Sequence, residues 1–432
     1  MRRHLLSLSL LLAPAISLAA PKNIIYMIGD GMGPSYLSAY RYFNDDSTTA
    51  EVENTIFDQL WQGMATTYPD DDTYVTDSAA GATALATGIK SYNGAIAVNR
   101  QHMPVGTMMQ LAKNLGKANG IVASSQINHA TPASFLAHNK SRRNYDAIAD
   151  MYLDYRINGK PVADVLLGGG TKYFIREDRN LVNEFKQLGY QYSDNWQQLS
   201  ALTAAPAIAL LAETGLPAVL NSKQDSQLAR LTTKALELLT PAKKGFVLMV
   251  EGSQIDWCGH DNDIACAMAE MNDFANAIAV AKAYVDKHPD TLLVITADHE
   301  TGGLSLGAAG EYQWLPEVIR KVKATGRSIA EQLKLAESDA AALALWAELT
   351  SISLTDEEQA SLLATRQQDE TALRKLSNQL VAKYSYTGWT SGGHTAADVA
   401  VLAYGKDAKD FAGFQDNTQI AKKLMQYIQQ TK

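Results

Sequence analysis

The chain has 432 residues, and 46% of them are hydrophobic, so it is long enough to bury a sizeable core. Its formal net charge is −8 and its isoelectric point is near 5.5. This balance argues against nucleic acid or an acidic membrane surface as a partner, because both would need clustered Lys and Arg. An anionic small molecule would have to be attracted by local cations.

The first element along the chain is a predicted signal peptide over residues 1–19. Arg2 and Arg3 form a basic start, residues 5–16 are apolar, and the Ser-Leu-Ala sequence at 17–19 offers a small-x-small cleavage site. The apolar stretch is too short to span a bilayer, and we find no other candidate membrane anchor. We therefore expect the mature protein to be exported, either to a periplasm or to the medium.

Apolar, strand-like runs follow, and clusters of acidic and imidazole side chains adjoin them. The runs at 22–29, 246–250 and 291–296 lead into such clusters, and a fourth cluster ending at His394 precedes the run 399–404. Short continuous apolar runs separated by helical patterns indicate buried parallel strands of an α/β fold. Ligands of such folds bind at the carboxyl ends of the strands. A helix cap, a turn or a solvated charge could explain any one of these clusters, but such ordinary explanations account poorly for four of them.

The stretch Thr76-Asp77-Ser78-Ala79-Ala80-Gly81 places one hydroxyl among small residues, ahead of a helix-forming segment. Backbone N–H groups and the positive end of the helix dipole favour phosphate at such a position. The small neighbours leave the serine oxygen accessible. Taken alone, the stretch fits an ordinary N-capping Asp or Ser equally well.

Helical patterns cover residues 104–118, 264–286 and 418–429, and a strand-like run at 120–125 leads towards His129.

The two cysteines, Cys258 and Cys266, are eight positions apart. On one straight helix they would lie about 12 Å apart, which is beyond bridging distance. A turn between them would allow a disulfide, which an oxidising compartment permits. We expect two buried thiols, with the disulfide as the alternative.

Residues 310–386 differ in character from the rest of the chain. They are rich in Ala, Leu, Glu, Gln and Lys, and Thr355-Asp356-Glu357-Glu358 is a capping-box pattern that marks a helix start. The segment interrupts the chain between Asp298 and His394, so we expect its two ends to lie close to the site that these clusters form. It is either a helical addition that only stabilises the protein, or a crown or lid that shapes substrate access or a subunit interface.

In combination, these motifs resemble the alkaline phosphatases. The residues 77–84 are similar to the nucleophile signature of that family, and the other motifs follow in the family's order. The similarity covers roughly residues 22–310 and 388–405. The motifs that carry it are Asp30-Gly31-Met32-Gly33, Asp77 to Ala84, His129 to Ser134 with Arg142 eleven positions after Thr131, Glu251…Asp256…His260, Asp298-His299 and Gly393-His394.

The resemblance implies a central, largely parallel sheet flanked by helices on both faces, formed by residues 20–432 as a single catalytic domain with 310–386 inserted. It also implies two Zn²⁺ and one Mg²⁺ per subunit. The types of side chain support the division into two zinc sites and one magnesium site, because imidazole suits zinc and an oxygen-only ligand set suits magnesium. The implied ligands are Asp256, His260 and His394 for one zinc, Asp30, Asp298, His299 and the Ser78 oxygen for the other, and Asp30, Thr131 and Glu251 for the magnesium.

The activity that the resemblance implies is hydrolysis of phosphate monoesters through a phosphoserine at Ser78, by a homodimeric enzyme. Arg142 would hold two phosphate oxygens, and Arg143 is the competing candidate. The alternatives are a phosphodiesterase or sulfatase of the same superfamily, or a periplasmic phosphate-binding protein without turnover. The sequence around Ser78 lacks the Cys-x-Pro-x-Arg stretch that a sulfatase needs. No ligand expected of the enzyme is missing.

His129 and Trp257 indicate a subtype within the family. They stand where some bacterial relatives have Asp and Lys, and the pair resembles the pattern of animal-like and cold-active bacterial alkaline phosphatases. We expect His129 to reach the magnesium site through water or to bind the ion weakly, which leaves the affinity and identity of the third metal open.

Overall fold

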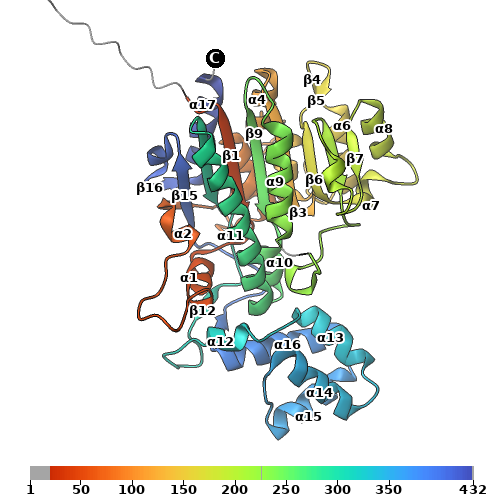
Figure 1. Cartoon of the computed structure of the whole chain (residues 1–432), viewed down its shortest axis with the longest axis vertical. Coiled ribbons are helices and arrows are strands. Elements are labelled where there is room, and N and C mark those ends of the chain that lie inside the picture. The colour runs from red at the N-terminus through yellow and green to blue at the C-terminus, as the bar shows by residue number, and fades with distance from the viewer. Residues whose placement is uncertain (1–19, 225, 431–432) are drawn as a thin grey trace, which may run out of the picture.

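The computed structural model describes residues 20–224 and 226–430 (Figure 1). The predicted signal peptide, residues 1–19, lies outside the described residues. Among the residues that are described, no helix combines the length and apolar character needed to cross a bilayer.

A ten-stranded sheet forms the centre of the molecule, and its strands are largely parallel, as predicted. The apolar run at 22–29 forms the strand β1, which lies between β9 and β10 and pairs in parallel with both. Only β15 runs antiparallel to its neighbours in this sheet. In order, the strands are β16 (Gly413–Asp416), β2 (Trp61–Thr66), β15 (Val399–Gly405), β10 (Thr291–Thr296), β1 (Asn23–Gly29), β9 (Phe246–Gly252), β3 (Ala118–Gln126), β6 (Val165–Gly169), β8 (Ala207–Leu210) and β7 (Gln191–Ser193).

Helices cover both faces of this sheet, and Figure 1 shows α9 and α11 in front of it and α4 behind. One face carries α1 (Pro34–Phe43), α2 (Ile56–Gln59), α9 (Gln227–Leu239) and α11 (Ile264–Lys287). The other carries α3 (Ser78–Thr87), α4 (Met108–Asn114), α5 (Ala130–Leu136) and α17 (Asn417–Gln430). The elements α6 (Tyr145–Asp154), α7 (Thr171–Phe174), α8 (Leu181–Gln187), β4 (Arg156–Ile157) and β5 (Lys160–Pro161) lie near the β7 edge.

The helix predicted over 104–118 is shorter than expected. It begins only after Thr107, whose side chain forms a capping box with Gln110, and it ends before Gly116, which has a φ of +83°. The last residue of the predicted helix, Ala118, instead begins β3 and pairs with the neighbouring strand β9.

The register of the sheet brings the chemically reactive clusters to one edge. Ile28 near the end of β1 lies beside Glu251 of β9 and beside Thr296 of β10. Asp30 directly follows β1 and Asp298 is the second residue after β10, so both lie at the same edge as Glu251. A short helix, α10 (Gln254–His260), then continues from β9 at this edge.

The segment predicted to be inserted forms a lobe of helices beyond that edge of the sheet (Figure 1). Its two ends are held together because Leu306 of β12 pairs with Thr387 of β13 in an antiparallel ladder. The predicted capping box at Thr355 is present. The strands that flank the segment are β12 (Leu304–Leu306) and β13 (Thr387–Trp389). The helices within it are α12 (Pro316–Ile319), α13 (Gly326–Leu335), α14 (Asp339–Thr350), α15 (Asp356–Arg366) and α16 (Glu370–Ser385).

Candidate metal centre and active site

Ser78 is the first residue of α3, as the sequence predicted, and it is buried. The side chain of Asp77 caps the helix by accepting a hydrogen bond from the Ala80 amide at 2.9 Å. Gly81 lets this helix approach the metal-ligand loop, because a Cβ there would lie 2.8 Å from the carbonyl oxygen of Asp298. As a result, the Ser78 Oγ lies 3.1 Å from Nε2 of His299.

Asp256, His260 and His394 form the first group of potential metal ligands, with donor atoms within 4.8 Å of one another. The Nε2 atoms of both histidines lie 3.4 Å from Oδ1 of Asp256. Each Nδ1 lies 2.8 Å from a backbone carbonyl, that of Gly392 for His260 and that of Thr76 for His394. These carbonyls favour a proton on Nδ1, which leaves the Nε2 lone pairs directed at the shared space.

A second group surrounds His299, whose ring is fully buried. Its Nε2 lies 3.2 Å from Oδ1 of Asp30 and 3.4 Å from Oδ2 of Asp298, in addition to its contact with Ser78. The other oxygen of Asp298 accepts hydrogen bonds from the amides of Gly31 and His299. The predicted ligands of the second zinc therefore surround Nε2 of His299, and an oxygen of Asp256 also lies within 4.8 Å of the donor atoms of Asp30 and His299.

The third group contains Asp30, Glu251 and His129, whose donor atoms also lie within 4.8 Å of one another. Thr131, the third predicted magnesium ligand, is buried, and its hydroxyl has no hydrogen-bond partner among the described residues. The structure thus places the His129 imidazole beside the oxygen-only ligand set that the family resemblance implies. Trp257 packs edge-on against His129, with the ring centroids 5.9 Å apart.

The carboxylates of this centre fit divalent cations. Both oxygens of Asp30, Oδ2 of Asp298 and Oε1 of Glu251 are buried and accept no hydrogen bond within the described residues. Burial raises the pKa of Asp298 to about 7 and that of Glu251 to about 7. Burial, together with the neighbouring carboxylate of Asp298, also raises the pKa of Asp30. Several buried carboxylates at one point need positive charge to remain ionised, and bound cations would supply it.

Arg142 points into the same region, whereas Arg143 is exposed. One guanidinium nitrogen of Arg142 lies 3.1 Å from Oδ2 of Asp77, and the other lies 3.3 Å from Nε2 of His129. Burial, and next the charge of Arg142, lowers the pKa of His129 to about 3, so this imidazole is neutral at physiological pH. The position of Arg142 agrees with the register that the sequence suggested.

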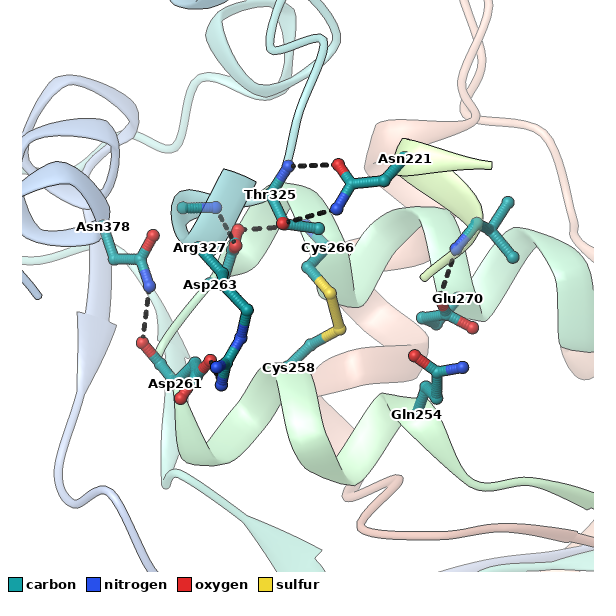
Figure 2. The surroundings of a disulfide bond; sticks show 12 residues. Asn221, Gln254, Cys258, Asp261, Asp263, Cys266, Glu270, Thr325, Arg327 and Asn378 are labelled. Carbon is teal, nitrogen blue, oxygen red and sulfur yellow. Dashed lines mark hydrogen bonds and ion pairs between the residues drawn. A yellow bond between two sulfur atoms is a disulfide. The ribbon is translucent and has the colours of Figure 1, made fainter. Parts of the chain in front are cut away.

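The prediction of two free thiols was wrong, because Cys258 and Cys266 form a disulfide (Figure 2). The chain does not continue as one helix: α10 ends at His260 and α11 begins at Ile264, so the turn between them brings the two Cα atoms to 5.5 Å.

The same turn holds the helical lobe. Asp263 caps α11 through the Cys266 amide and also accepts a hydrogen bond from the Gly326 amide at 2.7 Å. Arg374 and Asn378 of α16 bond to Asp261. Figure 2 shows the contact of Asn378 with Asp261 beside the disulfide, which therefore lies between the helix that carries Asp256 and His260 and the inserted segment.

Sequence reasoning missed Glu300 and Thr301, which directly follow Asp298 and His299. The Glu300 carboxylate accepts hydrogen bonds from the Gly303 amide and from the hydroxyl of Thr395, the neighbour of His394. Thr301 contacts metal-ligand candidates directly. Their adjacency to the Asp-His pair was the one signal available in the sequence.

Comparison with known proteins decides the family. A sequence model described as alkaline phosphatase matches residues 21–430. The chain belongs to the alkaline phosphatase family. Alkaline phosphatase 3 of Bacillus subtilis is 46% identical over 411 residues, which cover 94% of this chain and 89% of that protein. The predicted family, fold and enzyme class, a phosphoric monoester hydrolase, are confirmed.

Solved alkaline phosphatase structures agree with this assignment. A cold-active alkaline phosphatase from a psychrophilic Shewanella species superposes with a TM-score of 0.90 at 49% identity, covering 94% of this chain and 99% of that one. The alkaline phosphatase of the Antarctic bacterium TAB5 gives a TM-score of 0.70 at 28% identity, with 95% and 99% covered. The family match extends through the inserted helical segment, which the resemblance drawn from the motifs did not include.

Proposed function

We propose that this enzyme hydrolyses phosphate monoesters to an alcohol and inorganic phosphate through a covalent phosphoserine at Ser78. One observation carries the proposal: the Ser78 Oγ, at a helix N-terminus, lies 3.1 Å from Nε2 of His299, which belongs to a group of potential metal ligands. The helix N-terminus and Arg142 would supply the positive field that the net charge of −8 lacks.

We further propose zinc in the two histidine-containing groups and magnesium in the third. When bound, such cations lower the pKa of a hydroxyl or water and stabilise charge on the reacting oxygens. Asp256, His260 and His394 would hold one zinc, and Asp30, Asp298, His299 and Ser78 the other. Asp30, Thr131 and Glu251 would hold the magnesium, beside His129. A His-to-Asp mutant of TAB5 alkaline phosphatase is described with Mg bound in its M3 site, which supports magnesium as the third ion.

The chain's own residues account for the steps around phosphorus. The Ser78 hydroxyl gives up its proton and its oxygen attacks phosphorus, forming a phosphoserine as the bond to the alcohol oxygen breaks. The alcohol oxygen takes up one proton as it leaves, so the number of protons balances. Water then attacks the phosphoserine, and inorganic phosphate leaves as the Ser78 hydroxyl is restored. Arg142 would hold two phosphoryl oxygens with its planar fork through both steps. Asp77 keeps that fork oriented from 3.1 Å away.

The inserted helical segment, within what we take as one catalytic domain, is proposed to shape substrate access. A cavity of about 1010 Å³ is lined by residues of its helix α16 and by His260 of the first metal group, with Trp389 also in its wall. A cavity of this size can take the alcohol portion of a substrate much larger than phosphate. Alternatively, the segment would form part of the subunit interface of a homodimer. The disulfide supports export to an oxidising compartment, a periplasm or the medium.

The test compares a chromogenic phosphate monoester with the matching diester and sulfate, together with metal analysis of the purified enzyme. We expect turnover of the monoester, zinc as the main metal, and a phosphorylated Ser78 peptide after an acid quench. Ser78→Ala should lose turnover, while Ser193→Ala, which removes a buried hydroxyl bonded to the Asn195 carbonyl far from the site, should not. Preferred turnover of the diester, or turnover that survives Ser78→Ala, would refute the proposal.

A further inference from the structure

Thr301 contacts two of the candidate metal ligands, although it is not itself one of the ligands predicted from the Asp298-His299 motif. It is the second residue of β11 (Glu300–Thr301), which pairs with β14 (His394–Thr395) so that Thr301 lies opposite His394. Its amide donates to the Gly31 carbonyl at 3.1 Å, and its side chain is fully buried.

The hydroxyl of Thr301 bridges two candidate metal ligands, Asp256 and His299, which the proposed assignment gives to different zinc ions although their donor atoms also fall into one group with Asp30. Its Oγ1 lies 2.5 Å from Oδ1 of Asp256 and 3.2 Å from Nδ1 of His299. A carboxylate can only accept, so the single hydroxyl hydrogen goes to Asp256 and the oxygen must accept from Nδ1–H of His299. This places the His299 lone pair on Nε2, the atom that faces Ser78.

Two glycines make room for this side chain and fix its orientation. A Cβ at position 31 would lie 2.7 Å from the Thr301 Oγ1, and a Cβ at position 259 would lie 3.0 Å from its Cγ2 methyl. The methyl therefore packs towards α10, and the hydroxyl is directed at Asp256 and His299. A threonine that served only to fill space would not need its hydroxyl between two potential ligands.

We propose that Thr301 is a positioning residue that links the two zinc groups by hydrogen-bonding to Asp256 and His299 at once. This inference rests on the proposed function, since the metals are assigned there. Without the hydroxyl, the Asp256 oxygen and the His299 ring each lose a partner in a buried site, so both groups would bind metal less well. Loss of such a partner behind a ligand typically weakens metal binding or activity by about 10–100-fold.

The test uses the full-length enzyme and three variants. Thr301→Val removes the hydroxyl but keeps the shape, and Thr301→Ser keeps the hydroxyl. Thr232→Val is the matched control, because Thr232 is also fully buried but its hydroxyl bonds only to the Leu228 carbonyl in α9. Zn²⁺ affinity is measured by competition with a chelator, and the absorption spectrum of the Co²⁺-substituted enzyme reports the geometry of the ligands.

We expect Thr301→Val to bind Zn²⁺ about 10–100-fold more weakly and to change the Co²⁺ spectrum, while Thr301→Ser and Thr232→Val resemble the wild type. Equal Zn²⁺ affinity and an identical spectrum in Thr301→Val would overturn the proposal. If Thr301→Val does not fold, Thr301→Ser and Thr301→Ala provide the same comparison, because they differ only in the hydroxyl. A wild type that binds no Zn²⁺ would refute the proposed function instead.

Discussion

Removal of the Cys258–Cys266 disulfide tests how much the turn between α10 and α11 depends on it. The double variant Cys258→Ser/Cys266→Ser opens a loop of eight residues in the unfolded chain. The disulfide lowers the conformational entropy of the unfolded chain, and for a loop of that length its removal should lower the free energy of unfolding by about 2.5 kcal/mol at 25 °C. With an unfolding entropy of about 2.1 cal/mol/K per residue and about 400 residues, the melting temperature should fall by about 3 °C.

Differential scanning calorimetry of the zinc-loaded enzyme measures this change. Wild-type enzyme treated with a reductant should melt at the temperature of the double variant, and the reductant should leave the double variant unchanged. Both proteins need the same excess of Zn²⁺, because a ligand that binds only the folded state raises the melting temperature itself. Equal melting temperatures of oxidised wild type and double variant would show that the bond does not constrain the unfolded chain as reasoned.

Four further predictions follow from the site and its surroundings. His394→Ala should lose one zinc and most turnover, by several powers of ten; unchanged metal content would contradict its assignment. His129→Asp replaces a neutral imidazole with a carboxylate, the harder ligand that magnesium prefers, so it should need less Mg²⁺ for half-saturation when metal-stripped, zinc-reconstituted enzyme is titrated. Replacing residues 310–386 with a short Gly/Ser bridge should mainly change substrate selectivity or association, measured by kinetics and light scattering; complete unfolding would point to a core role. Burial raises the pKa of Glu270 from 4.5 to about 8, so the neutral form is favoured in the folded state, and this contribution to stability is lost as pH rises from about 4.5 to about 8. Glu270→Gln should make the melting temperature less dependent on pH over that range, and parallel curves for the two proteins would refute the shift.

The sequence by itself determined the elements that local chemistry specifies. The apolar run before Asp30 and the same pattern at 246–250 and 291–296 predicted buried parallel strands, and the structure confirms all three. Ser78 at a helix start was predictable because small residues and a capping Asp specify such a terminus locally. The residue types alone favoured imidazole-containing sets for zinc and an oxygen-only set for magnesium, and this assignment of ions stays a prediction.

The tertiary structure decided what depends on residues far apart in the chain. Whether the two cysteines could pair depended on where α10 ends, and a helical pattern does not reveal a turn of three residues after His260. His129 joins Asp30 and Glu251 only because β3, β1 and β9 end at the same edge of the sheet. The hydroxyl of Thr301 reaches Asp256 across 45 positions of sequence. Such contacts depend on how the whole chain packs, so no local pattern in the sequence predicts them.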